Sequence, residues 1–305
     1  MFDIIDGVLL KCNVEDDIIY LPDSVKIILP NSFKKCNPKK IVGNEVKYIL
    51  GLNSNVEVLD FPKLKRINKL DCPNLVELTI SKDTYIKKIS KLPMTIRIGN
   101  CEYKSSDDLV TRFKNYDEEK DINAFKENTN IIHLKDNIIE YVSYDNENLI
   151  NSIVLLNNIL NKIPEHIKNI ILDKNDIFIL DIYMTESNDF VGGLASKELN
   201  LSLVSQKYLY TLVHEMGHLF DFETNLSDTD EFKTIYEAEK DYINGISSRE
   251  NMSIMSHVKD KKEEFFAESF KRYILDRENF ELDCPNTKKF FDDALNIEKY
   301  DIKAR

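Results

Sequence analysis

Two histidines lie four residues apart in the run from Leu212 to Asp221, with a glutamate directly after the first of them. In a helix, side chains at i and i+4 share a face with about 5–6 Å between their Cβ atoms, so His214 and His218 can bind one ion. Imidazole nitrogens bind zinc at about 2.0–2.1 Å. Glu215 lies beside that face, where a carboxylate can take a proton from a water that the metal activates. The spacing predicts a zinc-binding helix that carries its own general base, and the alternative is a packed or solvated pair of histidines.

A second helix is predicted over residues 262–274, because its apolar residues recur at helical spacing. Glu264 and Glu268 share a neighbouring face of that helix. A structural zinc site closes its fourth position with Cys or His, whereas two histidines and one glutamate leave that position for water. The combination is therefore typical of a catalytic site. The alternative interpretation is a solvated charged face between Lys262 and Lys271.

Together, the runs HEMGH (residues 214–218) and EFFAE (residues 264–268) resemble the gluzincin metallopeptidases of the anthrax lethal factor type, which include the clostridial Pro-Pro endopeptidases. The resemblance implies that Glu264 is the third ligand of one Zn²⁺ per chain. It implies that Glu268 hydrogen-bonds His214 and fixes its tautomer, as metal-binding histidines usually require. The resemblance covers roughly the last half of the chain, from about Glu147 onward.

The same resemblance suggests roles for a segment before the zinc helix and for one residue after the second histidine. Gly192, Gly193 and Leu194 precede residues 198–203, whose apolar and polar residues alternate, and the pattern predicts a turn and a half-buried strand. The resemblance implies that a substrate peptide lies along this segment as an added strand. Asp221 matches an aspartate of the lethal factor motif, and helix capping or solvation remains open as its role.

One position departs from that family. Seven residues before Glu264 the family carries a tyrosine thought to stabilise the oxyanion, and this chain has His257 there. Because an imidazole can donate a hydrogen bond to a developing oxyanion, we predict His257 as that donor; the alternative is an exposed polar loop residue. A metzincin is excluded, because that class needs a glycine and a third ligand where this chain has Asp221 and Thr224.

Length and composition indicate a globular protein of two parts. The chain has 305 residues, 42% of them hydrophobic, and no apolar run approaches the roughly 18 residues of a membrane span. Its start lacks the basic end and apolar stretch of a signal peptide. We therefore expect a protein that stays in the cytoplasm or is exported by a non-classical route. The sequence does not predict the oligomeric state.

Charge divides the chain. Residues 1–104 carry 17 Lys and Arg against 13 Asp and Glu, whereas residues 105–305 carry 24 against 40. This shift favours a boundary near residue 105. The overall net charge of −12 and the scattered basic residues of the first part argue against a nucleic-acid partner. The five cysteines form no Cys-x-x-Cys pair, and we expect reduced thiols, although the sequence does not exclude a disulfide.

The first third of the chain shows weak self-similarity. Residues 56–61 and 75–80 both read apolar-x-x-Leu-x-apolar, with a looser repeat at residues 94–98. Residues 21–33 resemble the phrases of BspA-like leucine-rich repeats. A period near 20 with one short strand per turn predicts a solenoid, in which each repeat buries its apolar edge on its neighbours. The alternative is an ordinary all-β domain.

The predicted fold class is α+β. A short leucine-rich-repeat-like β-rich solenoid (residues 1–104) is followed by a linker or accessory segment (105–145) and a mainly helical zincin-type peptidase domain with a small mixed sheet (146–305). Strands are predicted at residues 131–134 and 138–142, and a helix at residues 149–160.

The predicted function is zinc-dependent hydrolysis of peptide bonds in a protein or peptide substrate, with the repeat module for recognition or docking. One alternative is a catalytically weak or inactive peptidase-like binding protein that acts through its repeat module. Another is a metal-dependent hydrolase of a non-peptide amide.

Overall fold

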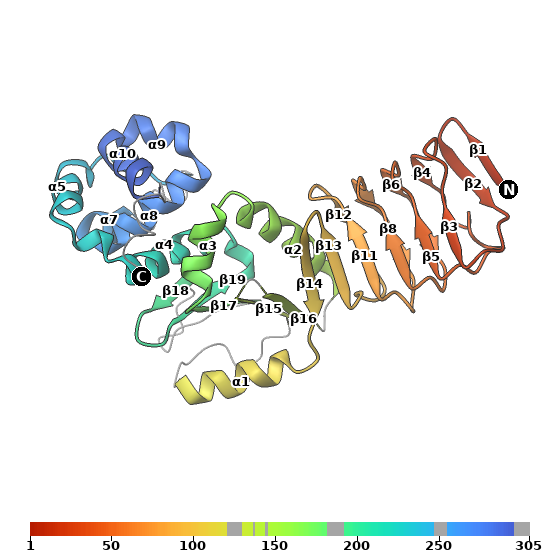
Figure 1. Ribbon diagram of the computed structural model, residues 1–305, viewed down its shortest axis with the longest axis horizontal. Coiled ribbons are helices and arrows are strands. Elements are labelled where there is room, and N and C mark those ends of the chain that lie inside the picture. Colours follow the sequence, from red (N-terminus) through yellow and green to blue (C-terminus); the bar gives the residue numbers. More distant parts are fainter. Residues whose placement is uncertain (121–129, 137, 144–145, 182–191, 247–254, 296–305) are drawn as a thin grey trace. The chain divides into compact units, whose positions relative to one another are not determined.

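The computed structural model describes residues 1–120, 130–136, 138–143, 146–181, 192–246 and 255–295. The chain divides into two compact units, and the first comprises residues 1–119, 126–132 and 138–158. The second comprises residues 120–125, 133–137 and 159–305. Large sheets, a solenoid-like arrangement of strands and a helical part confirm the predicted α+β class (Figure 1).

The first unit is a solenoid of short strands. One sheet has the strand order β1-β2-β4-β6-β9-β12, with bounds Phe2–Ile5, Val8–Cys12, Ile27–Ile28, Tyr48–Ile49, Arg66–Ile67 and Tyr85–Ile86. A second run of strands has the order β3-β5-β8-β11-β13-β14, with bounds Ile18–Tyr20, Lys40–Val42, Val58–Asp60, Glu77–Ile80, Thr95–Ile98 and Cys101–Ser105. The strands β7 (Leu52–Asn53) and β10 (Leu70–Asp71) form a separate parallel pair. Neighbouring strands lie side by side along the solenoid (Figure 1).

Register explains why these short strands are stable. In the first sheet, parallel pairing places buried aliphatic residues in one row: Leu9, Ile28, Ile49, Ile67 and Ile86. In the second run, the equivalent row is Ile19, Ile41, Leu59, Leu78 and Ile96. Each residue is at most 2% exposed, so each repeat buries its apolar edge on its neighbours. The predicted period near 20 is confirmed by this register.

The last turns of the solenoid are closed by other elements of the same unit. Strand β14 pairs antiparallel with β13 and parallel with β16 (Ile138–Ser143). Helix α2 (Asn146–Leu160) supplies Asn151, whose side chain accepts a hydrogen bond from Ile86 N at 3.0 Å and donates one to Ile86 O at 2.9 Å. The amide side chain thus satisfies backbone groups of the last strand of the first sheet, which a bare sheet edge would leave unpaired.

The second unit is mainly helical around a small mixed sheet. Its strands have the order β18-β19-β17, with bounds Gly193–Ser196, Leu201–Ser205 and Asp176–Leu180. Strand β19 pairs parallel with β17 and antiparallel with β18. Its helices are α3 (Glu165–Leu172), α4 (Thr211–Thr224), α5 (Asp230–Glu239), α7 (Met255–Asp260), α8 (Lys262–Leu275), α9 (Arg277–Asp283) and α10 (Pro285–Ala294). The 3₁₀ turns η1 (Gln206–Tyr208) and η2 (Leu226–Asp228) flank α4.

Aromatic side chains form the core of the helical part. Phe232 of α5 packs against Phe266 of α8 at a ring-centroid distance of 5.1 Å, and Phe266 packs against Phe291 of α10 at the same distance. These rings lie in the T-shaped and tilted arrangements that aromatic pairs prefer. The core therefore fixes α8, the helix predicted to carry the two glutamates.

Most predicted elements of the second half are confirmed with shifted ends. The half-buried strand predicted from residue 198 begins at Leu201 in β19 and is buried along its whole length, because it lies between β17 and β18 in the sheet order. The turn predicted before it is wrong, since Gly193–Ser196 form strand β18. The pair predicted at residues 131–134 and 138–142 corresponds to β15 (Asn130–Lys135) and β16. Helix α1 (Leu109–Lys120) occupies part of the predicted linker, and residues 121–129 lie outside the described chain. Among the helices in the described ranges, none has the length and apolar character needed to cross a membrane.

Candidate metal centre

The run HEMGH (residues 214–218) lies on helix α4, as predicted. Its apolar residues are buried on one side against β18, β19 and α8. The helix ends at Asn225, which adopts the left-handed conformation with φ of 52° and donates its backbone N–H to Asp221 O. Asparagine tolerates this conformation at a helix end better than most residues.

Helices α4 and α8 cross at a glycine. A Cβ atom on Gly217 would lie 2.9 Å from Ala267 Cα and 3.1 Å from Ala267 O, so only glycine permits this approach. Because Ala267 lies between Glu264 and Glu268 on α8, the close crossing brings both carboxylates to the histidines of α4. The local sequence thus explains the separation of the two helices as well as their residues.

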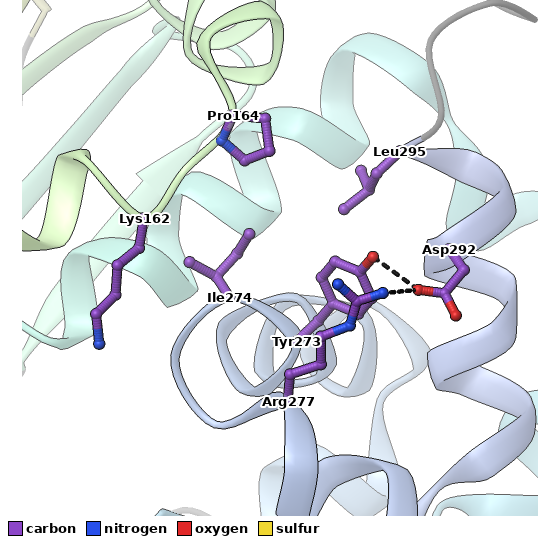
Figure 2. Close-up of a pocket in the computed structure, with 7 residues that line it drawn as sticks. All are labelled: Lys162, Pro164, Tyr273, Ile274, Arg277, Asp292 and Leu295. Carbon is purple, nitrogen blue, oxygen red and sulfur yellow. Dashed lines mark hydrogen bonds and ion pairs between the residues drawn. The ribbon is translucent and has the colours of Figure 1, made fainter.

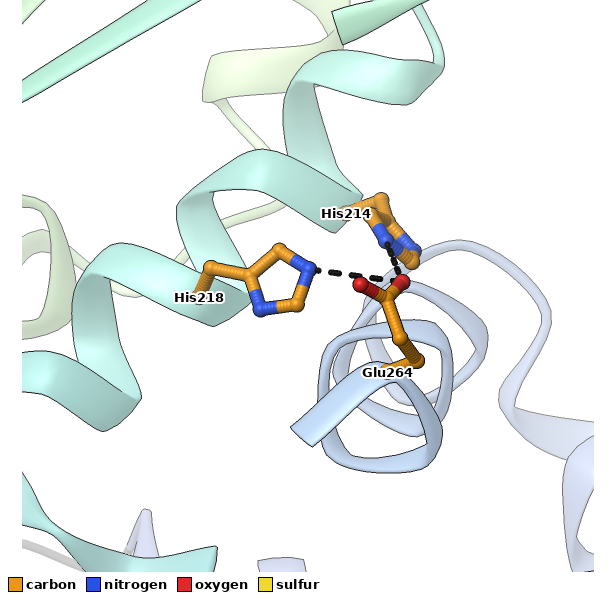
Figure 3. Close-up of side chains that lie close together, drawn as sticks. All are labelled: His214, His218 and Glu264. Carbon is orange, nitrogen blue, oxygen red and sulfur yellow. Dashed lines mark ion pairs between the residues drawn. The ribbon is translucent and has the colours of Figure 1, made fainter. Parts of the chain in front are cut away.

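The crossing brings three predicted ligands together. The imidazole Nε2 atoms of His214 and His218 lie 3.3 Å and 3.6 Å from Glu264 Oε2 (Figure 3). One ligand atom from each residue lies within 4.8 Å of the other two. In a tetrahedral site with bonds of about 2.0–2.1 Å, two ligand atoms lie roughly 3.3–3.4 Å apart. The three side chains therefore fit a zinc ion without rearrangement of the helices.

Glu268 contacts the other side of the first histidine. Its Oε2 lies 3.1 Å from Nδ1 of His214, which leaves Nε2 directed toward Glu264. The carboxylate is 1% exposed and forms an ion pair with Lys271 Nζ at 2.9 Å. A carboxylate in this position accepts the Nδ1 proton and keeps Nε2 available as a metal ligand.

The carboxylates of the cluster favour positive charge at its centre. Burial disfavours a charge on His214, but the carboxylates of Glu264 and Glu268 outweigh it and raise the pKa of that imidazole to about 10. Hydrogen bonds from His214 and His218 hold the pKa of Glu264 well below its usual range. Burial raises the pKa of Glu268, but His214 and Lys271 outweigh it and lower that pKa to about 2. Metal binding requires deprotonated carboxylates and imidazoles, so a divalent cation would replace the proton that these groups share.

Glu215 is buried beside the ligands. It is 5% exposed, and burial raises the pKa of its carboxyl above the ordinary value. A raised pKa brings a carboxylate closer to the value at which a general base works best near neutral pH. The side chain lies against Gly193 at the start of β18, where a Cβ atom would be 2.5 Å from Glu215 Oε1.

Two other predicted residues form no hydrogen bond or ion pair with the three ligand residues among the contacts of the described chain. The carboxylate of Asp221 accepts hydrogen bonds from Ser227 N at 2.8 Å and Ser227 Oγ at 2.6 Å, which join the end of α4 to η2. His257 lies on α7 with an exposed side chain. In the described part of the chain, no hydrogen bond or ion pair joins that side chain to His214, His218 or Glu264.

The predicted substrate segment lies at the edge of the small sheet. Gly193 and Leu194 belong to β18, and Gly192 O accepts a hydrogen bond from Ser205 N at 2.9 Å just before it. Strand β18 is the last in the sheet order, so one of its edges has no partner strand among the described residues. Leu194 is 38% exposed there.

The second unit also contains a pocket that includes none of the predicted site residues. It is lined by Lys162, Pro164, Tyr273, Ile274, Arg277, Asp292 and Leu295 (Figure 2). Asp292 accepts a hydrogen bond from Tyr273 Oη at 2.8 Å and pairs with Arg277. Asp292 thus already has partners, and the sequence contains no motif that would have indicated the pocket.

Sequence reasoning missed Lys271. The sequence indicates this lysine only as the flank of a solvated face, yet its side chain is 3% exposed and pairs with Glu268. Its spacing of three residues from Glu268 was the available signal, since i and i+3 side chains meet on a helix.

Comparisons with known proteins found solved structures that resemble this chain. The structure resembles that of the Pro-Pro endopeptidase from Paenibacillus alvei with a TM-score of 0.38 and 18% sequence identity. The match covers 49% of this chain and 94% of that one. No protein-family model and no curated protein sequence matches the chain. A likeness this weak carries no argument about function, so the proposal below depends on the side chains.

Proposed function

We propose that the second unit is a zinc-dependent endopeptidase of gluzincin type that hydrolyses peptide bonds in a protein or peptide substrate. The observation that carries the proposal is the separation of 3.3 Å and 3.6 Å between Glu264 Oε2 and the Nε2 atoms of His214 and His218. Two imidazoles and one carboxylate at these separations match a catalytic zinc site, which keeps its fourth position open.

Each residue of the cluster has a separate task in this proposal. His214, His218 and Glu264 would hold Zn²⁺, and Glu268 would hold His214 in the required tautomer through Nδ1. When bound, zinc would polarise the scissile carbonyl and lower the pKa of a water toward about 7. Glu215 would take the proton from that water and pass it to the leaving amine. Its buried position supports this role, because a desolvated carboxylate holds a proton more readily.

Two further positions complete the proposal. His257 would donate a hydrogen bond to the oxyanion, in place of the tyrosine that the resembling family carries. Asp221 would act indirectly, since its two hydrogen bonds with Ser227 fix the end of the helix that carries both histidines.

The edge of β18 that has no partner strand among the described residues supports a peptide as the substrate. An extended peptide can add to an unpaired strand edge through backbone hydrogen bonds. The segment Gly192–Leu194 begins this edge, and Gly193 lies against the proposed base. A peptide on this edge would therefore pass the group that activates the water. The solenoid would contribute recognition or docking of the protein that contains the peptide.

The test is cleavage of a peptide library by the full chain loaded with zinc. We expect a defined set of products, and Glu215→Ala should lower turnover by at least about 10²–10⁴-fold while it keeps its zinc. Equal activity of the two proteins would point to a contaminant. A protein that binds zinc and cleaves nothing would favour the alternative, a peptidase-like binding protein that acts through its solenoid.

A further inference from the structure

The side chain of the proposed base packs against a glycine of strand β18. A Cβ atom on Gly193 would lie 2.5 Å from Oε1, 2.6 Å from Cγ and 2.8 Å from Cδ of Glu215. Favourable carbon–carbon contacts are at about 3.5–4.0 Å, so any side chain at position 193 would occupy space that Glu215 fills. The buried glutamate and the strand cannot both keep their places if residue 193 has a Cβ.

Backbone conformation does not explain the glycine. Gly193 is in strand β18, pairs with Val204 of β19 and has no positive φ, in contrast to Gly7 and Gly99. An L-amino acid can adopt strand dihedrals without strain. The requirement for glycine at this position is therefore steric and comes from Glu215.

The strand start is fixed on its other sides. Gly192 O accepts a hydrogen bond from Ser205 N at 2.9 Å, and a Cβ on Gly192 would lie 2.9 Å from Thr211 Oγ1 in the first turn of α4. The backbone at residues 192–193 is thus held between β19 and the helix that carries Glu215. A strand fixed in this way restricts the positions open to the Glu215 carboxylate.

We propose that Gly193 is a positioning residue that sets the place of the Glu215 carboxylate through direct backbone contact. The sequence resemblance implied substrate binding for this glycine, and the geometry assigns it a second task that acts through the base. The catalytic part of this inference depends on the proposed function of Glu215. The contact itself does not.

The first experiment needs neither metal nor substrate. Thermal unfolding of the full chain in chelator is compared for wild type, Gly193→Ala, Glu215→Ala and the double variant. Overpacking costs enough stability that Gly193→Ala should lower the Tm of the second unit by about 2–4 °C. In the Glu215→Ala background the same substitution should have almost no effect, because the group it displaces is gone. Equal lowering in both backgrounds would overturn the steric assignment.

The second experiment measures turnover and zinc content. Displacement of a base by about 1 Å can cost 10²-fold, so Gly193→Ala should lower kcat by roughly that factor with zinc content and KM near wild type. Gly192→Ala is the matched comparator, because its Cβ would meet Thr211 instead of Glu215, and its kcat should fall less. A rise in KM with unchanged kcat, or equal losses in both variants, would contradict the positioning role.

If wild type shows no turnover, the proposed function fails, while the unfolding comparison still decides whether Gly193 and Glu215 are coupled.

Discussion

The solenoid and the candidate metal centre obtain their geometry in opposite ways. In the first sheet of the solenoid, equivalent positions hold equivalent residues, such as Ile28, Ile49 and Ile67. Each repeat therefore makes the same contact as the repeat before it. The metal centre has one crossing, where Gly217 meets Ala267, and each ligand occurs once. A substitution in one repeat leaves the strand register of the neighbouring repeats intact. The single helix crossing has no second copy that could preserve the ligand geometry after a substitution.

Substitutions in the two regions should therefore affect different properties of the protein. A solenoid position contributes stability in proportion to the area it buries, and its loss is local. A position at the α4–α8 crossing affects ligand geometry as well as stability, because Glu264 and Glu268 reach the histidines only through that close approach. The same size of change should therefore have consequences of different kinds in the two regions.

The largest expected effect is the loss of zinc from Glu264→Ala. Removal of one of three protein ligands leaves too few donors to compete with water or chelator. Metal analysis of the purified protein should show close to one zinc per chain in wild type and little in the variant. Glu263→Ala is the matched control, because that neighbouring side chain is 54% exposed and pairs with Lys262. Full zinc in Glu264→Ala would overturn the assignment of Glu264 as the third ligand.

A smaller effect is expected at His257. If its imidazole donates only to the oxyanion, His257→Ala should lower kcat by roughly 10²–10³-fold while KM and zinc content stay near wild type. His257→Tyr should restore part of the loss, since a phenol offers the same kind of donor. Steady-state kinetics on a library-derived peptide would measure both. An alanine variant with unchanged kcat would make His257 an ordinary exposed residue of α7.

The crossing itself gives the next prediction. Gly217→Ala places a Cβ 2.9 Å from Ala267 Cα, and the helices must separate to accept it. We expect about 1–3 kcal/mol of destabilisation together with weaker zinc binding, measured by denaturant unfolding and by competition with a chelator. Met216→Leu, a volume-conserving change of a buried residue on the same helix, should cost less and leave zinc affinity unchanged. Unaltered zinc affinity in Gly217→Ala would show that the ligands do not depend on this approach.

The sequence predicted the parts of the site that follow from local periodicity. The spacing of His214 and His218 predicted a shared helix face, and the spacing of Glu264 and Glu268 predicted another, because i and i+4 positions coincide on any α-helix. The nineteen-residue period predicted the solenoid for a similar reason, since parallel register requires equal spacing. Each of these predictions needed only one element or one repeat.

Contacts between elements were not predictable from spacing. The closeness of Gly193 to Glu215 depends on how β18 meets α4, and the burial of Lys271 depends on what packs over α8. Asn151 reads as an ordinary polar residue of an apolar helix, yet it pairs with the backbone of Ile86, 65 residues earlier in the chain. Such pairings arise only once the chain has folded, because tertiary packing decides which faces meet.

A conservative change in the solenoid should have a smaller effect than the change at Gly217. Ile67 is fully buried in its row between Ile49 and Ile86, and Ile67→Val removes one methylene from it. We expect about 0.5–1.5 kcal/mol of destabilisation in denaturant unfolding, with zinc content and kcat on a short peptide unchanged. A loss of zinc from this variant would contradict the contrast between the two regions.

The smallest expected effect is on the acid dependence of stability, and it concerns the partly buried carboxylate of Asp176. Burial raises the pKa of Asp176, but hydrogen bonds from His133 at 2.7 Å and Lys135 at 2.7 Å outweigh it, so the folded pKa lies below the ordinary 3.8. A depressed carboxyl pKa contributes stability above the unfolded pKa of about 3.9, and that contribution is lost as pH falls through the folded value. Asp176→Asn should therefore flatten the acid limb of stability against pH.

The matched change in the solenoid is Glu45→Gln. Hydrogen bonds from Lys63 and Lys26 lower the pKa of Glu45, but this carboxylate lies at the surface, where solvent screens ion pairs and leaves them little net effect on stability. The measurement is the free energy of unfolding of each variant in chelator between about pH 5 and pH 2.5. Protonation of the predicted zinc ligands contributes equally to every variant, so the differences between variants report Asp176 and Glu45. Asp176→Asn should be less stable than wild type at pH 5 and should converge with wild type toward the acid end, where Asp176 becomes protonated. Glu45→Gln should follow wild type throughout. If the two variants behave alike, burial does not distinguish the carboxylates of the two units, and the Asp176 pair is no stronger than a surface contact.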